Sequence, residues 1–128
     1  MFREQPILIV EDEPFIAMTL ADAVAELKGV VIGPLATVRE TLEILDRQVV
    51  AAAILDAELR DRDITPVALR LAYMGVPLVI HSGTGLPPAV AALRPDLPLI
   101  MKSASALTVV HRLLKEIGIP PIPIPLVQ

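Results

Sequence analysis

The chain contains no cysteine, no tryptophan and only three other aromatic residues, Phe2, Phe15 and Tyr73. The absence of cysteine excludes disulfide frameworks, thiolate nucleophiles and cysteine zinc sites. The scarcity of aromatic rings excludes stacking platforms for nucleic-acid bases. Basic residues are also too few: 11 Lys and Arg stand against 15 Asp and Glu, a net charge of −4. A negative net charge repels phosphate groups, so it argues against nucleic acid or an anionic membrane as a partner bound through bulk electrostatics.

What is present is enough for one packed domain. The 128 residues are 54% hydrophobic, which favours a folded core over disorder. The first apolar run, residues 7–10, is too short for a signal peptide, and no stretch approaches the length that spans a bilayer. We therefore expect a cytoplasmic protein.

Short apolar runs alternate with segments of helical period, a pattern typical of a parallel sheet with crossover helices. The five runs cover residues 7–10, 30–32, 51–55, 76–80 and 97–101. The first, third and fourth contain no polar residue and predict central strands buried on both faces, with Pro77 tolerated at a strand start. The second run ends at Gly33-Pro34 and the fifth contains Pro98, so both suit edges.

Five helices are expected between and after these strands, over residues 14–28, from 37, from 65 to 75, over 88–94 and over 103–117. Thr37 and Glu40 form a capping box, and Thr65 is the expected cap of the third helix. The last helix is expected to face inward with Leu107, Val110, Leu114 and Ile117, and to leave His111 on the surface. The acidic run at residues 61–63 suits a solvated loop, and residues 119–128 suit a proline-rich tail following a domain of residues 1–118.

Polar residues follow four of the predicted strands: Glu11-Asp12-Glu13, Asp56, His81-Ser82-Gly83 and Lys102. Because ligands of open parallel sheets bind at the carboxyl ends of the strands, these side chains are expected to converge. Crowded carboxylates must neutralise or bind a cation, and an all-oxygen set suits Mg²⁺.

The residue types at this edge predict phosphoryl transfer. Asp56 would attack phosphorus as the nucleophile, Asp12 and Asp56 would hold the metal, and Glu11 would act through water. Ser82 could donate to a phosphoryl oxygen, and Lys102 could pair with its negative charge.

Each of these residues also has a purely structural explanation when it is taken alone. Asp12 and Glu13 precede a helix, where acids stabilise the helix dipole, and Asp56 could simply turn the chain. Ser82 could be an ordinary loop residue and Lys102 a solvated lysine. The expected placement on one edge is what favours function.

This constellation, in this chain order, resembles the receiver domain of two-component response regulators. The matching segments are residues 8–13, 52–56 and 79–83, together with Lys102, and the resemblance covers residues 5–117. It implies a flavodoxin-like, doubly wound five-stranded parallel sheet in the order 2-1-3-4-5. It also implies a phospho-acceptor that takes phosphoryl onto Asp56 from a histidine kinase or histidine phosphotransfer protein and signals through protein contacts, without being a turnover enzyme. Mg²⁺ would be held by Glu11, Asp12, Asp56 and the backbone carbonyl of Glu58.

The chain departs from that family in several places and is similar to its divergent, stand-alone members. Ser103 stands where a proline is usual, Leu99 where an aromatic switch residue is usual, and His81 where the family is apolar. Because leucine cannot reproduce the rotation of an aromatic ring, we expect phosphorylation to move residues 82–94 more than strand five. Two alternatives remain open: a non-phosphorylated, receiver-like interaction module, and a haloacid-dehalogenase-like phosphatase. The phosphatase requires an aspartate where the chain has Glu58.

Overall fold

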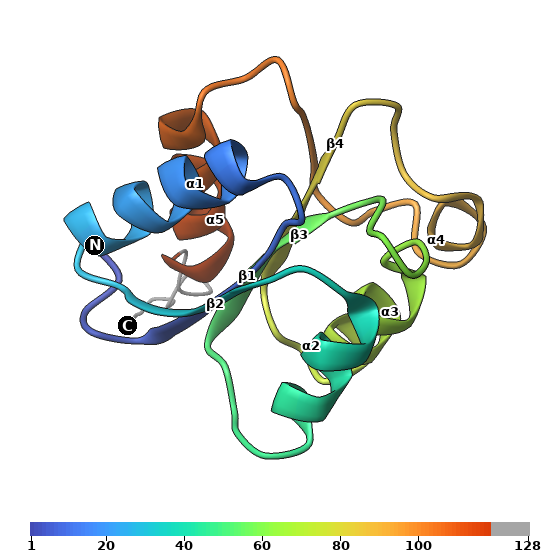
Figure 1. The fold of residues 1–128 in the computed structure, drawn as a ribbon, viewed down its shortest axis with the longest axis horizontal. Helices are drawn as coiled ribbons and strands as arrows, with labels where there is room; N and C mark the ends of the chain where they lie inside the picture. The colour runs from blue at the N-terminus through green and yellow to red at the C-terminus, as the bar shows by residue number, and fades with distance from the viewer. Residues whose placement is uncertain (119–128) are drawn as a thin grey trace, which may run out of the picture.

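A computed structural model describes residues 1–118 of the chain; the predicted proline-rich tail lies outside the described residues. In chain order the elements are β1 (Pro6–Val10), α1 (Pro14–Glu26), β2 (Val30–Leu35), α2 (Val38–Leu45), β3 (Ala52–Asp56), α3 (Thr65–Tyr73), β4 (Leu78–Ser82), α4 (Pro88–Leu93), β5 (Leu99–Met101) and α5 (Ala106–Gly118). Strands and helices alternate, with helices on both faces of one sheet (Figure 1). Among residues 1–118, no helix combines the length and the apolar character needed to cross a membrane.

All strand pairs are parallel, and the order is β2-β1-β3-β4-β5. This confirms the predicted fold class and strand order. The three strands expected at the centre, β1, β3 and β4, are buried almost throughout, whereas β2 and β5 form the edges. Strands without polar residues occupy the centre because both of their faces are covered.

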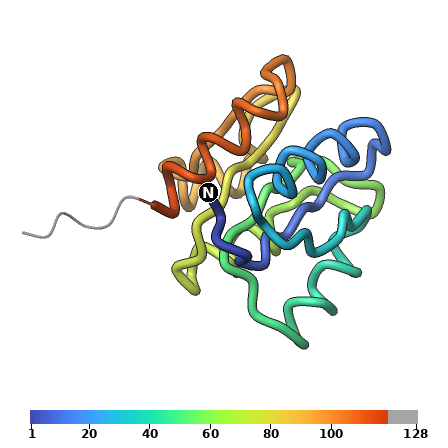
Figure 2. The backbone as a smooth tube through the Cα atoms, turned by 90° about the vertical axis from the view of Figure 1, so that its left-hand side faces the viewer, coloured from blue at the N-terminus to red at the C-terminus, as the bar shows by residue number. Residues whose placement is uncertain are grey.

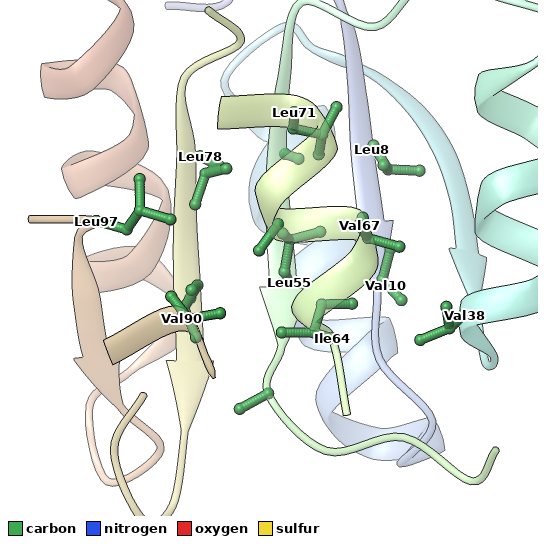
Figure 3. Close-up of a cluster of buried hydrophobic side chains, with 14 of the residues drawn as sticks. Leu8, Val10, Val38, Leu55, Ile64, Val67, Leu71, Leu78, Val90 and Leu97 are labelled. Carbon is green, nitrogen blue, oxygen red and sulfur yellow. The ribbon is translucent and has the colours of Figure 1, made fainter. Parts of the chain in front are cut away.

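Two hydrophobic layers fill the space between the sheet and its helices. Helices α1 and α5 cover one face, and α2, α3 and α4 cover the other (Figure 1). On the second face, Ile64, just before α3, and Val67 and Leu71 of α3 lie over side chains of β1, β3 and β4 (Figure 3). The N-terminus lies beside the end of α5 (Figure 2), and Met1 and Ile117 line a common hollow there.

The predicted starts of the first two helices are confirmed. Pro14 occupies the first turn of α1, and the Glu13 side chain caps it by accepting a hydrogen bond from the Phe15 amide. At α2, Thr37 Oγ1 accepts from the Glu40 amide at 3.1 Å, as a capping box requires.

The prediction for α5 was wrong in its start and in part of its inward face. The helix begins at Ala106 rather than Ser103, because Ser105 Oγ accepts a hydrogen bond from the Thr108 amide and so caps the helix. Packing of α5 against α1 and the sheet buries Val109, Val110 and Leu113, whereas Leu107 is 52% exposed. Leu114 and Ile117 pack at the edge of the same cluster, and His111 is exposed as expected.

The acidic run at residues 61–63 lies in a loop that is largely exposed, as predicted, but its two carboxylates also cap helices. Both carboxylate oxygens of Asp61 accept hydrogen bonds from α2, from the amides of Val38 and Arg39 at 2.9 and 3.0 Å. These bonds lower the pKa of Asp61. Asp63 accepts from the Thr65 amide at 2.9 Å and therefore takes the capping role predicted for Thr65.

Several strand limits also differ from the prediction, and three of them have a clear cause. β4 begins at Leu78 and β5 at Leu99, so Pro77 and Pro98 lie just before them and pair only through their carbonyls. This follows because proline has no N–H to donate to a sheet. β2 continues beyond Ile32 to Leu35, passing Gly33, where φ is +106° and an added Cβ would lie 2.7 Å from the Ile9 carbonyl oxygen.

Candidate functional site

The polar residues predicted to converge do meet at the carboxyl edge of the sheet. Asp56 is the last residue of β3 and Ser82 the last of β4, while Glu11 and Lys102 directly follow β1 and β5. The extra length of β2 helps to place Glu11, because the Leu35 carbonyl accepts a hydrogen bond from the Glu11 amide at 2.8 Å. Parallel strands therefore deliver acids, a hydroxyl and an ammonium to one edge.

Three carboxylates form the centre of the site. One oxygen each from Glu11, Asp12 and Asp56 lie within 4.8 Å of one another. Glu11 and Asp56 are each 3% exposed, whereas Asp12 is half-buried. Glu13, the next residue along, is exposed and caps α1 instead. The register predicted for this acidic run, with Asp12 at the edge and Glu13 capping the helix, is confirmed.

Lys102 lies between two of the acids. Its Nζ is 3.1 Å from Asp56 Oδ2 and 3.4 Å from Glu11 Oε2. Burial opposes the ammonium charge, but the Asp56 and Glu11 carboxylates outweigh it and raise the pKa of Lys102. The lysine is therefore a fixed positive charge and not a solvated side chain.

Backbone amides hold the acids in place. The Glu13 amide donates to Glu11 Oε2 at 3.1 Å, and the Glu58 amide donates to Asp56 Oδ1 at 3.2 Å. The Glu58 side chain is exposed, so this residue takes part in the site through its backbone. Glu11 Oε1 is buried and accepts no hydrogen bond from residues 1–118.

The crowded acids resist ionisation. Burial, with the hydrogen bond and charge of Asp56 added, raises the pKa of Glu11 from 4.5 to about 7. Burial and the same neighbour raise the pKa of Asp12. A divalent cation bound between these carboxylates would attract their negative charges and would lower both pKa values.

The donor set fits Mg²⁺. It consists entirely of oxygens, which this hard cation prefers, and the unpaired Glu11 Oε1 needs a partner that residues 1–118 do not supply. Glu11, Asp12 and Asp56 could hold the ion, and the Glu58 carbonyl is the further ligand implied by the resemblance.

Ser82 is fixed at the edge by the loop that follows it. Its Oγ accepts hydrogen bonds from the Thr84 and Gly85 amides, both at 3.0 Å, and its carbonyl accepts from the Lys102 amide at 2.8 Å. Ser82 is 1% exposed, and its hydroxyl keeps its own O–H available as a donor. This places it to reach a group bound at the edge.

Sequence reasoning assigned no role to two further residues near the site. His81 is buried beside Lys102, and burial followed by the lysine charge lowers its pKa. The sequence signal that could have pointed to His81 is its position as a polar residue directly after the apolar residues of β4. Arg60 reaches the Asp12 carbonyl with a guanidinium nitrogen at 3.4 Å, a long-range contact for which the sequence carries no signal.

Solved structures resemble this chain over most of its length. SdrG from Sphingomonas melonis Fr1 is 34% identical, covers 93% of this chain and 100% of its own, and superposes with a TM-score of 0.75. The PhyR stress response regulator is 28% identical, with 89% of this chain and 46% of PhyR covered and a TM-score of 0.69. A scan of protein-family models and a search of the curated proteins find no match.

A third structure shares the fold at lower identity. The receiver domain of the sensor histidine kinase PA1611 from Pseudomonas aeruginosa PAO1 is 20% identical, covers 89% of this chain and 98% of its own, and has a TM-score of 0.75. That structure has a magnesium ion coordinated in its active-site cleft. The strand order, the acids that follow β1 and end β3, and the relatives agree: the chain belongs to the receiver domains of response regulators and has a role in two-component signalling.

Proposed function

We propose that the protein is a phospho-acceptor in which Asp56 receives a phosphoryl group from a phosphohistidine in the presence of Mg²⁺. The observation that carries this proposal is the position of Asp56. It ends a central strand and lies 3.1 Å from the Lys102 ammonium, and one of its oxygens lies within 4.8 Å of an oxygen of each of two other carboxylates. The magnesium ion in the PA1611 receiver domain supports the choice of metal.

In the proposed step, a carboxylate oxygen of Asp56 attacks phosphorus and forms a P–O bond, which gives an acyl phosphate. The P–N bond to the donor histidine breaks, and that histidine keeps the electron pair and takes up a proton. Bound Mg²⁺ would supply positive charge to the incoming phosphoryl group and would be held by Glu11, Asp12, Asp56 and the Glu58 carbonyl.

The remaining residues stabilise charge without exchanging covalent bonds. Lys102 already faces both buried acids and can follow the negative charge as it moves onto the phosphoryl oxygens. Ser82 can donate its O–H to one of these oxygens, because backbone amides already fix its Oγ. The chain would therefore accept one phosphoryl group, without turning over a substrate, and would signal through protein contacts.

The donor in this proposal is a histidine kinase or a histidine phosphotransfer protein. Membership of the receiver family supports either donor. Both donors carry the phosphoryl group on a histidine, so Asp56 would carry out the same attack on phosphorus with either of them.

The test is intact-mass measurement after incubation with acetyl phosphate, with Mg²⁺ or with EDTA. The wild-type mass should rise by one phosphoryl group only with Mg²⁺, and Asp56→Asn should prevent the rise. Asp96→Asn is the matched control, because that exposed aspartate lies in the loop before β5, at the opposite edge of the sheet, and should leave labelling intact.

Two results would contradict the proposal. Labelling of Asp56→Asn, or labelling without metal, would assign the chemistry elsewhere. A folded wild-type protein inert to both acetyl phosphate and beryllofluoride would favour the alternative of a non-phosphorylated interaction module.

A further inference from the structure

His81 occupies an unusual position for a polar side chain. It is the fourth residue of β4 and is 3% exposed. Side chains alternate along a strand, and Val79, two residues earlier, belongs to the cluster under α1 and α5. His81 therefore lies on that face, and neither of its ring nitrogens has a hydrogen-bond partner within residues 1–118.

A cavity of about 180 Å³ adjoins the imidazole. It is lined by Phe15, Ile16, Thr19 and Leu20 of α1, and by His81 and Lys102. The cavity is large enough for more than one water molecule. Ala104, Ala106 and most of the α1 side chains that line it are apolar, but Thr19, His81 and Lys102 offer polar atoms that can hold water. The same lysine thus faces the acids on one side and this cavity on the other.

The donors and acceptors around the cavity are complementary. An ammonium has three N–H donors; Lys102 donates one of them to Glu11 Oε2 at 3.4 Å, and its 3.1 Å contact with Asp56 Oδ2 is an ion pair. A neutral imidazole has one acceptor nitrogen and one N–H donor. Burial and the lysine charge favour that neutral form by lowering the pKa of His81. Thr19 donates its hydroxyl to the Ile16 carbonyl and keeps its oxygen free to accept.

We infer that this cavity is a hydrated pocket in which a water molecule accepts a hydrogen bond from a remaining N–H of Lys102 and donates one to an imidazole nitrogen of His81. His81 would then be a positioning residue that holds the ammonium between Asp56 and Glu11. The effect on phosphoryl binding rests on the proposed function, whereas the hydrogen bond itself is a property of the unmodified protein.

The hydrogen bond can be tested without any phosphoryl group. The chain has only two histidines, and His111 is exposed, so the imidazole nitrogen NMR signals of His111 are an internal reference. In wild-type protein we expect His81 to be neutral. Lys102→Met should shift its acceptor nitrogen and leave its N–H nitrogen nearly unchanged. Lys115→Met, on the exposed part of α5, is the control and should change neither nitrogen.

The consequence is tested by beryllofluoride binding with Mg²⁺. His81→Leu should weaken binding about tenfold, the order expected for loss of one hydrogen bond to a charged group. His81→Gln, which restores an acceptor, should recover most of the loss.

Unchanged His81 nitrogens in Lys102→Met, or equal shifts of both nitrogens, would overturn the inference. So would wild-type affinity in His81→Leu, or equal losses in the Leu and Gln variants. If wild-type protein binds no beryllofluoride, the proposed function fails while the NMR comparison still decides the hydrogen bond.

Discussion

The pKa of Glu11 makes the stability of the metal-free protein depend on pH. Burial and Asp56 raise this pKa from 4.5 to about 7 in the folded protein. Between these two values the folded state holds a proton that the unfolded state has released. The free energy of unfolding therefore falls as the pH rises through this window, and it levels off above about pH 7.

The size of this effect follows from the two pKa values. Moving the pKa from 4.5 to about 7 lowers the free energy of unfolding by about 3 kcal/mol at pH 8 relative to pH 4, at about 1.4 kcal/mol for each tenfold change. Because domains of this size are stable by roughly 5–15 kcal/mol, the loss is large enough to measure. Asp12, whose pKa is also raised, acts in the same direction.

The assay is urea unfolding in EDTA at constant ionic strength from pH 5 to pH 8. His81 acts in the opposite direction, because burial lowers its pKa and stability from this residue rises with pH towards 6.5. The Glu11 contribution is therefore taken as the difference between wild type and Glu11→Gln. Glu43→Gln, which removes an exposed carboxylate of α2, is the matched control and should retain the wild-type pH dependence.

Magnesium provides a second measurement of the same group. Metal binding requires the ionised carboxylate, so Mg²⁺ affinity should fall about tenfold from pH 8 to pH 6 if the pKa is about 7. A carboxylate with the ordinary pKa of 4.5 would show almost no change over this range. Identical pH dependence in wild type and Glu11→Gln, for both unfolding and Mg²⁺ affinity, would refute the reasoning.

Four further predictions follow from particular contacts. Asp12→Asn should abolish Mg²⁺-dependent NMR shifts, whereas Glu13→Gln should retain them, because Glu13 caps α1; the reverse result would contradict the site geometry. Asp61→Ala should speed amide hydrogen exchange in the first turn of α2, since this carboxylate accepts two of its amides; unchanged exchange would contradict that role. Leu71→Ala, at a fully buried position of α3, should lower the free energy of unfolding by about 2–5 kcal/mol in urea titrations. Beryllofluoride should change hydrogen exchange in residues 82–94 more than in β5, and changes confined to residues 97–117 would refute that expectation.

The strand centres and the acidic centre could be predicted because they depend on local pattern. Apolar runs of strand length between helical periods are sufficient for an alternating α/β fold, and a run without polar residues must be buried on both faces. Parallel strands bring their carboxyl ends to one edge, so Asp56 and Lys102 could be placed together before any distance was known. The capping box at Thr37 is equally local, because its hydrogen bonds join residues three apart.

Other features depend on contacts between distant parts of the chain. Asp61 caps α2 from more than twenty residues away, and its sequence neighbours give no indication of this role. The cap at Ser105 sets where α5 starts, and the packing of α5 against α1 and the sheet selects its buried residues, which the sequence pattern placed only in part.

The sequence by itself determined the alternation of strands and helices, the central strands and the set of groups at one edge of the sheet. Each follows from periodicity and from the direction of parallel strands. Only the tertiary structure decided that Glu11 is buried against Asp56, that Lys102 lies between the acids and that His81 faces a cavity behind the lysine. Burial and the distance between charges set these properties, and both arise only when separate elements pack together.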